Sequence, residues 1–184
     1  MFIQTEATPN PNTLKFIPGR EVLENGSAEF ERAEGYENSP LASRLFAIEN
    51  VDRVFFGPDF ISITKNDADW QHIKPSILGA IMDHYMSGDA VMQEGSDNGM
   101  LVEEYDNDDA QIVKTIKELL DTRVRPAVAH DGGDIRFQSF KQGIVYLHMQ
   151  GACAGCPSST ATLKHGIENL LRHFIPEVLE VRPV

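Results

Sequence analysis

The sequence is poor in cysteine, with only two among its 184 residues. Two cysteines are too few for the disulfide framework of a small secreted domain, so we expect a protein of a reducing compartment. Its apolar runs are only a few residues long, whereas a helix needs about 20 apolar residues to span a bilayer. We therefore expect a protein without a membrane-spanning segment and without a membrane partner.

The N-terminus lacks the usual features of a targeting sequence. Residues 1–6 have neither the basic start and apolar stretch of a signal peptide nor the Arg-rich, acid-poor character of a transit peptide. We therefore expect a cytoplasmic protein of bacterial type. If a transit peptide has been removed, the expected compartment is the mitochondrial matrix.

Basic residues are also scarce: 16 Lys and Arg stand against 28 Asp and Glu, a net charge of −12. This argues against nucleic acid as a partner, because binding to phosphate backbones depends on Lys and Arg. The charge is uneven: residues 1–87 carry 7 basic and 13 acidic groups, residues 88–109 none and 8, and residues 110–184 9 and 7. Only the last part has no acidic excess, which mildly favours a site that holds thiolates.

The acidic stretch also indicates how the chain is divided. Its composition is typical of a linker, and an acidic linker repels itself and stays extended. The sequence therefore predicts an N-terminal domain over residues 1–87, an acidic flexible linker over 88–107 and a C-terminal domain over 108–184. The expected fold class is α+β, with two small α/β-type domains.

The first domain shows alternating strand and helix patterns. A loop rich in Pro and Asn separates two short strands, Ser39-Pro40 opens a helix, and a Gly-Pro-Asp turn indicates a hairpin. The expected strands are 2–6, 13–17, 51–56 and 60–65, and the expected helices are 39–50 and 67–86, with residues 20–38 expected to be mostly loop with at most a short strand. The apolar stripe that begins at Trp70 is typical of a core, and Pro75 could kink its helix or mark its start.

The second domain has the order helix, strand, strand, helix. Its first helix is expected to begin at Asn107-Asp108 and to end at Val124-Arg125-Pro126. The expected elements that follow are a tight turn at 130–134, strands at 135–140 and 144–149, a helix capped by Ser158 or Ser159, and a short strand at 178–181.

Cys153 and Cys156 lie between the second of these strands and the last helix. The positive end of a helix dipole lowers the pKa of a nearby thiol, so this position is expected to favour thiolates. The neighbouring residues 151, 152, 154 and 155 are Gly or Ala, which leaves space beside the sulfur atoms. The pair is the candidate site for metal or cofactor binding.

The residues alone leave several chemistries open. A zinc site needs four ligands, which one chain does not supply at matching spacing, although two chains could; His165 and His173 are expected to be structural. A thioredoxin-like dithiol is expected in a different order of elements, and a reducing compartment disfavours a disulfide. An iron–sulfur cluster usually takes four thiolates and could be held by two chains.

A family resemblance bears on this choice. Val124-Arg125-Pro126, the Asp-Gly-Gly-Asp of residues 131–134 and the Cys-x-x-Cys stretch of residues 151–159 resemble the C-terminal domain of NifU-like (Nfu-type) iron–sulfur scaffold and carrier proteins. Residues 8–12, 39–42 and 54–64 resemble the N-terminal domain found in many Nfu proteins. The resemblance covers nearly the whole chain.

The resemblance implies that Cys153 and Cys156 ligate a labile [4Fe-4S] cluster shared by a homodimer and delivered to apo iron–sulfur proteins, with cluster-assembly proteins as further partners. The expected protein is not an enzyme. The rival functions are a thiol-disulfide oxidoreductase and a zinc-bridged structural dimer. Residues 131–134, His130 and His148 are expected to have structural roles.

Overall fold

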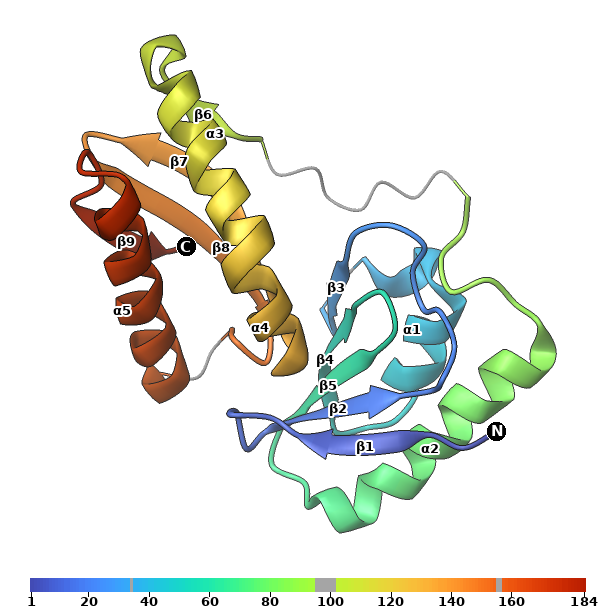
Figure 1. The fold of residues 1–184 in the computed structure, drawn as a ribbon. Coiled ribbons are helices and arrows are strands. Elements are labelled where there is room, and N and C mark those ends of the chain that lie inside the picture. The colour runs from blue at the N-terminus through green and yellow to red at the C-terminus, as the bar shows by residue number, and fades with distance from the viewer. Residues whose placement is uncertain (34, 95–101, 155–156) are drawn as a thin grey trace. The chain divides into compact units, whose positions relative to one another are not determined.

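The computed structural model describes residues 1–33, 35–94, 102–154 and 157–184. The chain divides into two compact units, residues 1–99 and 100–184 (Figure 1). Each unit combines one sheet with helices, so the α+β prediction is confirmed. The boundaries predicted for the two domains and the linker stay predictions. In the described part of the chain, no helix is long and apolar enough to cross a membrane.

The first unit contains a five-stranded antiparallel sheet with the order β1-β2-β5-β4-β3. The strands are β1 (Gln4–Ala7), β2 (Thr13–Ile17), β3 (Ala28–Glu31), β4 (Val51–Phe56) and β5 (Ile61–Lys65). The four predicted strands are confirmed. Strand β3 lies in a segment predicted to be mostly loop, and it is ordered by antiparallel pairing with β4, where Ala28 lies opposite Phe56.

The helices of this unit are η1 (Tyr36–Asn38), α1 (Pro40–Phe46) and α2 (Trp70–Ser87). Ser39 caps α1 as predicted: its Oγ accepts a hydrogen bond from the Ala42 N–H at 3.1 Å. Helix α1 ends at Phe46, four residues before the predicted end. Helix α2 passes through Pro75 without ending.

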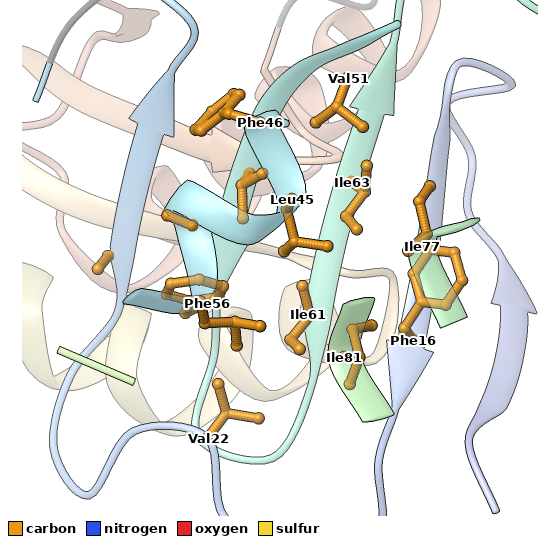
Figure 2. Packing of buried hydrophobic residues seen from close by; sticks show 14 of the residues in the cluster. Phe16, Val22, Leu45, Phe46, Val51, Phe56, Ile61, Ile63, Ile77 and Ile81 are labelled. Carbon is orange, nitrogen blue, oxygen red and sulfur yellow. The ribbon is translucent and has the colours of Figure 1, made fainter. Parts of the chain in front are cut away.

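The core of the first unit lies between one face of the sheet and helices α1 and α2 (Figure 2). Alternation along β4 selects that face, because Val54 and Phe56 belong to the core cluster whereas Phe55 does not. Trp70 packs against this cluster, and its Nε1 donates to the Pro11 carbonyl at 3.1 Å. The interpretation of Trp70 and its stripe as core is confirmed.

The second unit contains a four-stranded sheet with the order β6-β7-β8-β9. Its elements are β6 (Glu104–Tyr105), η2 (Asn107–Asp109), α3 (Ala110–Leu119), η3 (Leu120–Val124), α4 (Arg125–His130), β7 (Gly133–Lys141), β8 (Ile144–Gly151), α5 (Pro157–Phe174) and β9 (Glu180–Pro183). Strands β7 and β8 form the predicted antiparallel hairpin, and β6 and β9 lie parallel to their neighbours.

The predicted end of the first helix of this unit at Val124-Arg125-Pro126 is wrong. The chain stays helical from α3 through η3 into α4, which ends at His130. Segment η3 is a π-helix, whose hydrogen bonds run from i to i+5. Pro126 then falls in the first turn of α4, where its missing N–H would have no intrahelical partner in any case.

The acidic segment differs from the predicted extended spacer at both of its described ends. Val91 and Met92 pack against the core of the first unit, and the Ser39 hydroxyl donates to the Val91 carbonyl at 2.6 Å. At the other end, Glu104 and Tyr105 form strand β6 of the second sheet. Both ends carry apolar or aromatic side chains that pack on their unit. The prediction of an extended spacer used the average composition of the whole segment, and this average hid those side chains.

Candidate functional site

Cys153 follows the C-terminal end of β8 and precedes α5. Its side chain is 7% exposed and belongs to the apolar core of the second unit. The Thr160 hydroxyl of α5 donates to the Cys153 carbonyl at 3.0 Å, and the Ala152 N–H donates to the Gly132 carbonyl at 3.2 Å. The turn that carries Cys153 is therefore fixed to α5 on one side and to the start of β7 on the other.

The glycine pair opposite this turn has two different functions. Gly132 has a φ of +84°, a conformation that L side chains rarely adopt. Gly133 instead provides space: a Cβ atom there would lie 2.7 Å from the Cys153 Sγ and 2.7 Å from the Gln150 carbonyl oxygen. The sequence predicted only a tight turn at residues 130–134, so the close approach of the sulfur to Gly133 is a new finding.

An ion pair between Arg125 and Asp134 fixes the segment that contains the two glycines. The Arg125 guanidinium of α4 donates from Nε to Asp134 Oδ1 at 2.8 Å and from Nη2 to Asp134 Oδ2 at 2.9 Å. Asp134 is only 6% exposed, and its Oδ1 also accepts from the Ile135 N–H at 2.8 Å. The hydrogen bonds to Asp134 raise the pKa of Arg125 above its ordinary value, so the guanidinium stays charged at any physiological pH.

The prediction that Cys153 has a lowered thiol pKa is wrong. Burial, followed by the charges of Asp131 and Asp134, raises the pKa of the Cys153 thiol to about 12. Cys153 stands four positions before the first residue of α5, and the effect of a helix dipole is limited to the terminal turn. Desolvation therefore dominates, and the Cys153 thiol is protonated at neutral pH.

Cys156, the second predicted ligand, lies outside the described residues, so its role stays a prediction. Within the described ranges, no group of three or more His, Cys, Asp or Glu side chains is placed to hold a metal ion. The rings of His173 and Phe174 are in edge contact, with centroids 5.0 Å apart. Cys153 is thus the only predicted ligand whose surroundings are described.

Sequence reasoning missed the connection between Arg125 and Asp134. Both belong to segments that carried the family resemblance, but they are nine positions apart and no sequence signal pairs them. The approach of Gly133 to Cys153 was accessible in principle, because the register of the hairpin places Gly133 opposite Gly151. The hairpin register, counted from the β7–β8 turn and including the bulge between Phe137 and Ser139, predicts that the start of β7 lies next to the end of β8, which Cys153 follows.

Comparison with known proteins identifies both units. The family model described as "Scaffold protein Nfu/NifU N terminal" matches residues 3–88, and the model described as "NifU-like domain" matches residues 116–182. A solution structure of a NifU-like protein from Saccharomyces cerevisiae matches 51% of this chain and 86% of its own chain, with 28% identity and a TM-score of 0.47.

Similar proteins extend this match over the whole chain. The chain is 50% identical to the human protein named "NFU1 iron-sulfur cluster scaffold homolog, mitochondrial", over all of this chain and 72% of the human one. It is also 50% identical to "NifU-like protein 4, mitochondrial" of Arabidopsis thaliana, over 97% of this chain and 64% of that protein. It thus spans about two thirds of the length of these relatives. This chain belongs to the Nfu/NifU family of scaffold proteins.

Proposed function

We propose that the protein is an iron–sulfur cluster scaffold that holds a labile [4Fe-4S] cluster between two protomers and delivers it to apo-proteins. The observation that carries the proposal is the position of the chain's only two cysteines, which are separated by two residues and precede α5, in a chain similar over its full length to proteins named as iron–sulfur cluster scaffolds. In this function the cluster is cargo, and the protein is a carrier and not an enzyme.

The chemistry of Cys153 is compatible with such cargo, provided that its turn moves. Thiolates are the usual ligands of iron–sulfur clusters, and a thiol must lose its proton to ligate iron. Cys153 is only 7% exposed, so loading requires that residues 151–154 move to expose the sulfur, and the thiol loses its proton when it ligates iron. The cost of that movement favours release of the cluster, which suits a carrier.

Two cysteines per chain also imply a homodimer. A [4Fe-4S] cluster usually takes four thiolates, and this chain has only Cys153 and Cys156. Two protomers would supply the four ligands, and the cluster could leave when the protomers separate or when an incoming thiolate replaces one of theirs. Apo iron–sulfur proteins and cluster-assembly proteins are the proposed partners.

The first unit shows no catalytic constellation among its described residues, and we propose that it binds recipients or assembly partners. Removal of residues 1–87 is then expected to leave cluster loading intact while weakening delivery. Unchanged transfer to every recipient tested would contradict this role. The compartment proposed is the mitochondrial matrix, because the relatives are named as mitochondrial proteins. The expected cytoplasmic location finds no support in these names.

Anaerobic reconstitution with iron and sulfide tests the main proposal. We expect absorption and Mössbauer spectra of a [4Fe-4S] cluster, four irons per two chains, and the mass of a dimer. Cys153→Ser and Cys156→Ser should each abolish stable cluster binding. Uptake of zinc without iron, or disulfide exchange catalysed by a cluster-free monomer, would instead support one of the rival functions.

A further inference from the structure

The outer edge of strand β7 is covered by the end of the acidic segment. Glu104 lies opposite Ser139 and Tyr105 opposite Phe140, in parallel register. Strand β6 is only two residues long, and both residues are exposed. The chain therefore adds a short acidic strand of its own to a sheet edge that would otherwise be open at this point.

Three side-chain contacts accompany this pairing. The Lys117 ammonium of α3 donates to the two carboxylate oxygens of Glu103 at 2.7 and 2.9 Å. The Lys141 ammonium of β7 donates to Glu104 Oε2 at 2.6 Å. The ring of Tyr105 meets the ring of Phe137 edge to face, with the centroids 6.2 Å apart.

These contacts are of a kind that a competitor can replace. The Glu104 and Lys141 side chains are 61% and 57% exposed, and ion pairs in water contribute little to stability. A strand of two residues also offers few backbone hydrogen bonds to hold it in place. Strand β6 is accordingly a weakly held occupant of the β7 edge.

The same contacts define the chemistry that this edge accepts. Lys117 and Lys141 select carboxylates at two successive positions, Phe137 selects an aromatic ring at the next, and the backbone of β7 selects an extended chain. An open cavity of about 750 Å³ lies beside the edge; residues 103–106 line one part of it, and Lys141, Gln142, Ile144 and Tyr146 line the other. The second part stays with the sheet when β6 leaves, and it can receive the side chains of a segment longer than β6.

We propose that the β7 edge at Ser139 and Phe140 is a docking site for an extended acidic segment of a partner protein that carries an aromatic residue after two carboxylates. Strand β6 occupies this site in cis until such a segment displaces it. The proposal goes beyond cluster carriage and does not depend on it, because no contact in it involves Cys153. Failure of cluster binding and failure of docking are therefore separate outcomes.

The test uses the full chain and a fluorescent peptide that copies residues 102–108, with binding followed by anisotropy under reducing conditions. In the variant Glu103→Gln/Glu104→Gln/Tyr105→Ala the cis strand is weakened. We expect it to bind the peptide about tenfold more tightly than the unmodified chain, because a tethered competitor acts at a high effective concentration. A peptide with lysines in place of the two glutamates should not bind.

The matched control reverses the two cations. Addition of Lys117→Glu and Lys141→Glu to the triple variant should remove peptide binding, whereas addition of Lys114→Glu, on the same helix but without a described pairing to β6, should leave it. Equal peptide affinity of the unmodified chain and the triple variant would overturn the proposal. So would binding that survives reversal of both cations.

A second measurement keeps the proposal testable if the triple variant does not fold. Titration of the unmodified, isotope-labelled chain with millimolar peptide should shift the amide signals of Ser139 and Phe140, and unshifted signals would overturn the proposal. Sedimentation addresses a second copy as the occupant. A dimer of the unmodified chain that is lost in the triple variant would show that β6 is exchanged between copies, which would overturn the assignment to a different partner.

Discussion

The two units are similar in size and class but differ in how their cores are completed. The core cluster of the first unit consists of hydrophobic side chains, most of them from the sheet and from α1 and α2. The corresponding cluster of the second unit includes the thiol of Cys153, next to a glycine that the sulfur approaches closely. A nearly buried carboxylate, Asp134, stands one position further along.

This difference shows where the chain places its reactive groups. The core cluster of the first unit is made of aliphatic and aromatic side chains, whereas the second unit uses an ion pair and two glycines to shape one end of its sheet around a sulfur atom. Such a design makes that end sensitive to small changes in volume and charge. Unfolding of the two units can be followed separately. Trp70 is the only tryptophan of the chain and lies in the first unit, so its fluorescence reports on the unfolding of that unit.

The largest effect is expected from breaking the Arg125–Asp134 pair. Arg125→Met leaves a nearly buried carboxylate with only the more distant Arg136, at 3.7 Å, as a described ion-pair partner. We expect a loss of about 2–4 kcal/mol in the free energy of unfolding, because removing the nearer cation from a nearly buried carboxylate is costly. Chemical denaturation followed by circular dichroism measures it, and the transition seen by Trp70 fluorescence should stay unchanged.

The matched control is Arg44→Met in the first unit, because the Arg44–Asp89 pair is exposed on both sides. Its loss should be much smaller, as is usual for surface ion pairs. The double variant Arg125→Met/Asp134→Leu should recover most of the stability, since it removes the buried charge together with its partner. Equal losses for the two arginine variants would remove the contrast between the units.

The next effect concerns the space beside Cys153. Gly133→Ala places a Cβ atom 2.7 Å from the Cys153 Sγ and from the Gln150 carbonyl oxygen, so we expect a loss of about 1–3 kcal/mol from overpacking. The displaced sulfur should also retain less iron after reconstitution. Iron content per chain and denaturation midpoints are the two measurements.

Two helical glycines serve as controls for this substitution. A Cβ atom at Gly79 of α2 or at Gly166 of α5 would have no neighbour within 4 Å. Gly79→Ala and Gly166→Ala should therefore stabilise their helices by about 0.5–1 kcal/mol, because alanine has the higher helix propensity. If Gly133→Ala were as stable as these two variants, the turn that carries Cys153 could move aside without cost, and the predicted overpacking would be wrong.

The smallest effect concerns a buried histidine of the first unit. His84 is fully buried on α2, and neither ring nitrogen has a hydrogen-bond partner among the described residues. Burial, and then the charge of Arg44, lower the pKa of His84 below its ordinary value of 6.5, against the smaller opposing effect of Asp89. The unfolded chain therefore binds a proton at this position more readily than the folded one.

The lowered pKa of His84 makes the stability of the first unit depend on pH. The first unit should have its full stability above pH 6.5 and lose stability as the pH falls below 6.5, by at most about 1.4 kcal/mol per pH unit for one proton. His84→Leu should flatten this dependence when unfolding is followed by Trp70 fluorescence. His72→Gln, at an exposed position of the same helix, should keep it, and an unchanged slope in His84→Leu would contradict the assignment.

Features governed by local rules could be predicted from the sequence. The Ser39 cap, the hairpin of β4 and β5 and the hairpin of β7 and β8 each depend on residues within a few positions of one another. The placement of the Cys-x-x-Cys pair between a strand and a helix followed from the same rules. Family membership then came from motifs spread over both units.

Features that depend on tertiary surroundings could not be predicted in this way. Proximity of Cys153 to a helix suggested a low thiol pKa, whereas the surrounding core determines the opposite direction. The helix passes Pro126 because a π-helical segment changes the hydrogen-bond partners before it, and propensity alone does not report such a change. Strand β3 depends on β4 for its order, so its own four residues carried a weak signal.

The anchoring of Val91 by Ser39 has a consequence for how far the two units can separate. Because the described chain is fixed through Gln93, which donates from its backbone N–H to the Asn38 carbonyl at 2.9 Å, the tether effectively begins near Glu94. From Glu94 to Val102 there are eight peptide steps, a maximum span of about 28 Å at roughly 3.5 Å per residue. If β6 were released, the first fixed residue of the second unit would be about Asn107, and the maximum extended length of the chain between the two fixed ends would rise to about 45 Å. The Glu103 and Glu104 ion pairs thus set the maximum length of chain between the two anchored ends.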